Sequence, residues 1–67
     1  SQGSIVTELI KRLEGDLSKA KVRKEAFEGD KRRGHQNVDT HIAWCKAQIN
    51  QISITLFDIK ELTNNLG

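Results

Sequence analysis

The stretch from residue 38 to residue 59, VDTHIAWCKAQINQISITLFDI, decides the fold of this chain. Its apolar residues recur at alternating spacings of four and three, the heptad pattern of a helix that packs along one stripe. Ile52, Ile54 and Leu56 also alternate as a strand would, but the heptad runs unbroken through the whole stretch. We therefore expect a helix over about residues 38–66, whose buried stripe is Val38, Ile42, Cys45, Ile49, Ile52, Leu56 and Ile59.

A second heptad pattern comes earlier in the chain and predicts a helix over about residues 5–33. Ser4 can cap its first turn, and Gly34 suits the left-handed backbone position that follows a helix end. Gly29 offers an earlier alternative end. Lys24 stands at one position of the stripe, where its charge interrupts the apolar series. The remaining stripe positions of this helix are Val6, Ile10, Leu13, Leu17, Ala20 and Phe27.

The two predicted helices are joined by a short link at residues 34–37, and either Asn37 or Asp39 can cap the second helix. A short link makes neighbouring helices antiparallel. The sequence therefore predicts an all-α fold, an antiparallel two-helix hairpin that forms a single domain over residues 5–67. We interpret residues 1–4, SQGS, as the remnant of a cleaved tag, because the chain also contains no methionine.

The composition excludes several classes of protein. The chain has 67 residues and a single cysteine, which cannot form an internal disulfide. Hydrophobic residues make up 36 % of it, below the about 45–50 % of typical globular proteins. No apolar run approaches the ~18 residues of a membrane-spanning helix. A disulfide scaffold, a membrane span, a zinc finger and a self-contained enzyme of ordinary size are excluded. A short helical protein that needs a partner to fold well remains.

The second predicted helix is apolar on two sides, and a two-helix hairpin can cover only one of them. Contiguous exposed apolar patches mark protein interfaces, in which tryptophan and phenylalanine act as anchors. A simpler alternative is that Trp44 and Phe57 wrap around the edge of the hairpin as part of its core. We predict that the apolar residues outside the stripe bind a partner: Trp44 at heptad position c, Ala47 and Ile54 at f, Phe57 at b and Leu62 at g.

His41 and Cys45 lie one helical turn apart, a spacing that can place two metal ligands on one face. A zinc site needs three or four ligands, and only His35 and Asp39 are close enough in sequence to complete it. Cys45 also belongs to the stripe, where cysteine behaves as a small apolar residue. Catalysis by cysteine and histidine needs a cleft and an oxyanion donor. We therefore predict no metal site, no cofactor and no catalytic residue.

Basic residues are concentrated in the first predicted helix and at its end, where nine of the eleven lie, interleaved with six acidic residues. Such mixed charges are typical of a solvated helix face, and Phe27 is the only aromatic residue among them. The charge pattern therefore favours neither nucleic acid, which basic patches bind through phosphate contacts, nor a membrane surface. Membrane-surface binding would need the basic and the apolar face on one helix, and here they lie on different helices.

Several placed residues resemble a known family. A first helix with the Leu13-Glu14 dipeptide is followed by a basic turn ending in Arg33-Gly34, and then by a long helix with Trp44 and an isoleucine-rich run to Leu62. This arrangement resembles the small type III secretion proteins of the YscE/EscE/SsaE family, over about residues 13–62. The first arm is about one heptad longer than in some members, a difference that hairpins tolerate because it adds whole turns.

The resemblance implies a non-enzymatic cytoplasmic co-chaperone. Members of the family pair with a larger chaperone of the tetratricopeptide type, and the pair keeps the needle subunit monomeric until export. The expected partners are therefore a tetratricopeptide-like chaperone and, through it, the needle subunit. An alternative drawn from the residues themselves is self-association, in which two hairpins form a four-helix bundle that serves as an oligomerisation or regulatory module.

Overall fold

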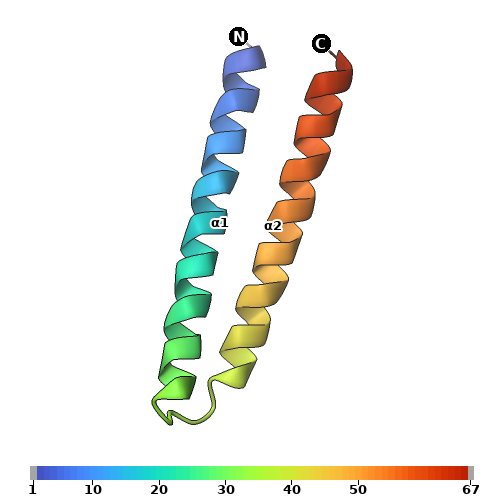
Figure 1. Cartoon of the computed structure of the whole chain (residues 1–67). Helices are drawn as coiled ribbons and strands as arrows, with labels where there is room; N and C mark the ends of the chain where they lie inside the picture. Colours follow the sequence, from blue (N-terminus) through green and yellow to red (C-terminus); the bar gives the residue numbers. More distant parts are fainter. Residues whose placement is uncertain (1, 67) are drawn as a thin grey trace.

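The computed structural model describes residues 2–66, and the side chains of residues 3–65. It contains helix α1, Gln2–Arg32, and helix α2, Asp39–Leu66, with no strand in this part of the chain. The two helices lie side by side and antiparallel, with both chain ends at the end of the hairpin opposite the link (Figure 1). The predicted all-α hairpin is confirmed, and the strand alternative at residues 52–56 is wrong.

Helix α1 ends in a Schellman motif. The N–H of Gly34 donates to the carbonyl of Lys31, and the N–H of His35 donates to the carbonyl of Asp30, each at 3.0 Å. Gly34 has a φ of +90°, a left-handed conformation that glycine adopts without the steric cost a Cβ would add. Gly34 therefore holds the position predicted for it, and Gly29, which lies inside α1, does not end the helix.

The start of α2 differs from the prediction. The helix begins at Asp39, so Val38 holds the N-cap position, and its carbonyl accepts the helical hydrogen bond from the N–H of Ile42 at 2.9 Å. The carboxylate of Asp39 pairs instead with Nζ of Lys31, at 2.8 Å, across the link. Asn37, the other predicted cap, adopts a φ of +66° in the link. Neither side chain therefore caps α2. The carboxylate of Asp39 pairs with Lys31, and Asn37 lies in the link with a left-handed backbone.

The start of α1 lies earlier than predicted. The helix already includes Gly3 and Ser4, so Ser4 lies inside the first turn and is not the cap. The hydroxyl of Thr7 donates to the carbonyl of Gly3 at 2.8 Å, one helical turn back. No proline stands among these residues, so nothing prevents the helical backbone from continuing through them.

A narrow apolar seam holds the two helices together. All thirteen residues predicted for the hairpin core lie in it, buried or half-buried. Two helices cannot enclose a side chain on every side, so most of the seam keeps some contact with water. The buried members are Ala20, Val38, Ile42, Cys45 and Leu56. The half-buried members are Val6, Ile10, Leu13, Leu17, Phe27, Ile49, Ile52 and Ile59.

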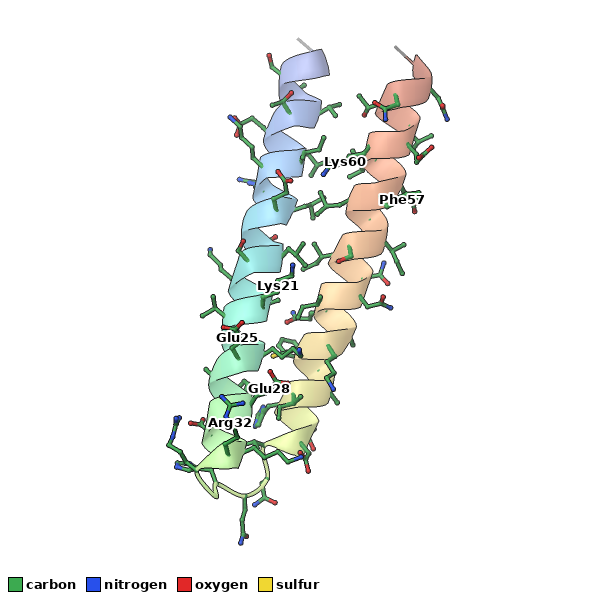
Figure 2. The ribbon with its side chains drawn as sticks, viewed as in Figure 1. Lys21, Glu25, Glu28, Arg32, Phe57 and Lys60 are labelled. Atoms are coloured by element: carbon green, nitrogen blue, oxygen red, sulfur yellow. The ribbon has the colours of Figure 1, made fainter. Side chains whose placement is uncertain are left out.

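Two contacts fix the alignment of the helices. The ring of Phe27 stacks on the ring of His41, with centroids 4.8 Å apart and planes 11° from parallel. Nζ of Lys60 lies 3.5 Å from the carboxylate of Glu14, and Figure 2 shows Lys60 reaching toward α1. Because these pairs lie in different halves of the hairpin, they define a single antiparallel register along a rod of 50 × 16 × 12 Å.

Candidate protein interface

The side of α2 turned away from α1 carries exposed apolar residues, which we call the outer face of α2. Trp44 is 56 % exposed, Ile54 47 % and Phe57 63 %, and Ala47 is also exposed. Figure 2 shows Phe57 on the side of α2 that points away from α1. The outer face is therefore left uncovered by the fold, and Trp44 and Phe57 do not wrap into the hairpin core.

The outer face is a band along the helix and not a single spot. At 100° and about 1.5 Å per residue, Ala47 and Ile54 lie on one line along α2. Trp44 and Phe57 flank that line on opposite sides and are separated by about 20 Å along the axis. Leu62, 63 % exposed, lies on the same side as Trp44, five helical turns further along. A partner that covered all five residues would have to lie lengthwise along α2.

The two flanks of the hairpin, where α1 and α2 meet at the surface, differ in chemistry. One flank is polar, because the Glu14–Lys60 and Lys31–Asp39 pairs bridge the helices there. An open hollow near the link belongs to this flank and is lined by Glu28, Lys31, Arg32, Asp39, Ile42, Ala43 and Lys46. Five of its seven lining residues are charged, so charged groups border this end of the polar flank.

The opposite flank is apolar toward the open end of the hairpin, a feature that the sequence interpretation missed. Leu9 lies five helical turns before Phe27 and therefore on the same side of α1. Leu62 lies three heptads after His41 and therefore on the same side of α2. Both leucines thus lie on the flank that carries the Phe27–His41 stack. Leu9 is 44 % exposed, and Ile5, one turn earlier, is 68 % exposed. By the register of the helices, Leu62 therefore lies on the same flank as Leu9 and at about the same level. Only the register of the helices reveals this.

His41 and Cys45 do not form a metal centre in the described residues. Cys45 is fully buried in the seam, and the His41 ring lies flat against Phe27. No three side chains of histidine, cysteine, aspartate or glutamate come together in this part of the chain. Their surroundings are those of a packed seam. Beside them, Oε1 of Gln48 is buried and lacks a hydrogen-bond partner.

The basic residues near the link are partly neutralised by acidic neighbours. The guanidinium of Arg33 donates to the carboxylate of Asp30 at 2.6 Å. Asp39 raises the pKa of Lys31, first by accepting a hydrogen bond from its ammonium group and second by charge attraction. Further along α1, Lys24 lies 3.7 Å from Glu28. These exposed pairs have the geometry of a solvated, mixed-charge surface.

No helix in the described part of the chain is long and apolar enough to cross a membrane. Comparison with known proteins identifies no relative: no protein-family model, curated protein or solved structure matches this chain. The candidate interface is therefore defined by the geometry of the hairpin alone.

Proposed function

We propose that this chain is a non-enzymatic binding subunit that attaches to a partner protein through the outer face of α2. The observation that carries the proposal is the exposure of Trp44, Ile54 and Phe57 on one helix. Large apolar side chains that lie singly on a surface are ordinary. Three of them on one side of a 28-residue helix, two of them aromatic, are typical of an interface.

The amount of exposed surface supports the same conclusion. A compact monomer of 7.6 kDa exposes about 4,300 Å², whereas the chain exposes 5309 Å². The surplus of about 1,000 Å² slightly exceeds the ~800 Å² that each partner hides in a standard interface. The radius of gyration is 15.5 Å, against about 11 Å for a compact chain of this length. The hairpin therefore exposes more surface than a compact protein of its size, which supports the binding of a partner protein.

The partner we propose is a tetratricopeptide-like chaperone, and through it the needle subunit of a type III secretion system, in the cytoplasm. The basis is the resemblance of the chain to the YscE/EscE/SsaE family over about residues 13–62. A rod 50 Å long has a shape that suits the extended concave surface of stacked helical repeats. In this role the hairpin would stabilise the larger chaperone by covering an apolar part of its repeats.

The test is co-expression with the tetratricopeptide chaperone from the secretion gene cluster of the same source, followed by purification through a tag on that chaperone. Replacing Trp44 and Phe57 together by serine removes two anchors, each worth about 1.5–3 kcal/mol when fully buried. The combined loss corresponds to roughly 10²–10⁴-fold in Kd. The double variant should fail to co-purify while its circular dichroism stays helical.

The matched control is Val22→Ser, which removes an apolar side chain that is 65 % exposed on α1. This variant should co-purify as the unchanged chain does, since Val22 lies off the outer face of α2. Survival of the complex in the double variant would show that another surface binds the partner. Loss of the complex in the Val22→Ser variant would show that the effect is not specific to the outer face.

A further inference from the structure

The outer face of α2 becomes acidic toward the open end of the hairpin. Glu61 follows Ile54 by one heptad and therefore lies on the line of Ala47 and Ile54. Asp58 lies one helical turn after Ile54, on the same side of the helix. Both carboxylates are exposed. The line of residues that is apolar at Ala47 and Ile54 thus carries two negative charges within about 10 Å beyond Ile54.

These two carboxylates lack the basic neighbours that the other acidic residues of the chain have. Elsewhere, each aspartate or glutamate has a lysine or arginine three or four residues away, or forms an ion pair across the link. Asp58 and Glu61 have no basic residue at those spacings, and none of the ion pairs among the described residues includes them. They also lie three residues apart, so they are neighbours on the helix surface and repel each other. The free hairpin therefore leaves two uncompensated negative charges beside Phe57.

The basic residues of α2, Lys46 and Lys60, do not reach these carboxylates. Lys60 reaches toward α1, where its Nζ lies 3.5 Å from the carboxylate of Glu14 (Figure 2). Lys46 lines the hollow of the polar flank, about 18 Å along the helix axis from Asp58. The last turn of α2 contains no basic residue. A fixed positive charge opposite Asp58 and Glu61 can therefore come only from another molecule.

We propose that the partner of the outer face carries an apolar stripe that ends in lysine or arginine residues, and that these residues pair with Asp58 and Glu61. The inference rests on the proposed function, because it describes the surface that binds the same face. The stripe covers Trp44 and Phe57 over about 20 Å, and the basic residues lie at the open end of the hairpin. Opposite charges across an interface fix its register and disfavour wrong partners. The two carboxylates therefore determine which end of the stripe lies at the open end.

The same two charges make other occupants of the outer face a poor match. The phosphates of nucleic acid and the anionic lipids of a membrane surface are negative, so the carboxylates repel them. A second copy packed through the same face would bring another Asp58 and Glu61 and no basic residue from that face. A protein surface with basic side chains compensates both carboxylates.

The first test compares two synthetic helical peptides that share a leucine stripe of about four turns, roughly 20 Å. One peptide carries two arginines at the end of the stripe, and the other carries two glutamines at the same positions. Fluorescence anisotropy measures their binding to the full chain. At low salt the arginine peptide should bind about 5- to 30-fold more tightly, as expected for two exposed ion pairs. Most of this preference should disappear at about 1 M salt, where the Debye length is about 3 Å.

The net charge of the chain is +2, so attraction by the whole molecule does not favour an arginine peptide. A preference for arginine therefore reports a local acidic site. Equal binding of the two peptides, or binding of neither, would overturn the proposal.

Charge-removing variants locate that site. Asp58→Asn combined with Glu61→Gln keeps the shapes of the side chains and should abolish the preference for arginine. The matched control is Asp16→Asn combined with Glu25→Gln, which removes two exposed carboxylates from α1 and changes the net charge equally. The preference should persist in the control, and its loss in both double variants would overturn the assignment to the outer face.

The direction of the stripe is tested with a nitroxide label on the arginine end of the peptide. In NMR spectra of the isotope-labelled chain, the label should broaden the backbone amide signals of residues 58–62 and spare those of residues 40–44. The opposite result would overturn the proposed direction. Co-purification with the chaperone is measured independently. If the chaperone is retained but the peptides bind equally, this inference fails alone, and if arginine is preferred but the chaperone is not retained, only the proposed chaperone partner fails.

Discussion

Leu56 and Phe57 are neighbours in sequence and have opposite environments. Leu56 is 6 % exposed and lies in the seam against α1, whereas Phe57 is 63 % exposed on the outer face. Replacing each residue by alanine separates the contribution of the fold from that of the interface, because both substitutions remove a large apolar side chain at the same place in α2. The expected free energies of unfolding differ sharply between the two.

For Leu56→Ala, the loss combines buried methyl groups with the cavity they leave, about 2–5 kcal/mol for leucine in a core. The seam is narrow and can partly collapse, so we expect a value of about 2–3 kcal/mol. A chain of this length has a total stability of roughly 3–10 kcal/mol. Phe57→Ala should change the monomer by no more than about 0.5 kcal/mol, since surface substitutions fall in that range.

The assay is urea unfolding followed by circular dichroism, at a protein concentration where light scattering shows a monomer. Under those conditions Leu56→Ala should move the midpoint far toward low urea, and Phe57→Ala should leave it nearly unchanged. In the presence of the partner, Phe57→Ala should also lower stability, because the complex is lost. If Phe57→Ala costs the monomer as much as Leu56→Ala does, Phe57 belongs to the core and the outer face is misassigned.

Two further substitutions test the link and its ion pair. Gly34→Ala forces a Cβ into a backbone with φ of +90°, and should lower the free energy of unfolding by about 1 kcal/mol in the same urea assay; no change would mean that the Schellman motif does not hold the link. Because Asp39 raises the pKa of Lys31 above its ordinary value of 10.5, the pair stabilises the fold fully below that value and is lost as pH rises through the raised pKa. Lys31→Gln should therefore reduce the loss of thermal stability as the pH rises above about 10.5, and an unchanged pH profile would contradict this.

The two helices and their seam follow from the sequence because a heptad pattern encodes both a helix and the side it buries. The thirteen residues of the predicted core lie in the seam, and Gly34 ends α1 as its lack of a Cβ suggests. Lys24, the charge in the stripe, is half-buried and pairs with Glu28 on its own helix. A long side chain can keep its ammonium group at the surface in this way while its stem packs in the seam.

Other features depend on which residues meet across the hairpin, which the sequence pattern does not give. Aspartate is a suitable helix cap, but Lys31 lies across the link and its ammonium group pairs with the carboxylate of Asp39. Ile5 and Leu9 fall outside the stripe of the first helix and stand out only once the register places Leu9 on the side of Leu62. What binds the outer face depends also on the surface of the molecule that binds, and the sequence of this chain does not describe that surface.

The exposed outer face and the thin seam have a common thermodynamic consequence. A partner that binds only the folded hairpin stabilises it by about 2.7 kcal/mol when present at 100 times its dissociation constant, and this is comparable with the lower range of stability for a chain of this size. Because binding supplies this stability, the free hairpin does not need a fully apolar seam. A charged residue such as Lys24 is therefore tolerated within it. A stronger seam would stabilise the free hairpin without adding affinity, whereas each apolar side chain on the outer face of α2 stabilises only the complex. In the proposed complex, the apolar surface of α2 is thus divided between the seam against α1 and an outer face that contributes stability only when another protein covers it.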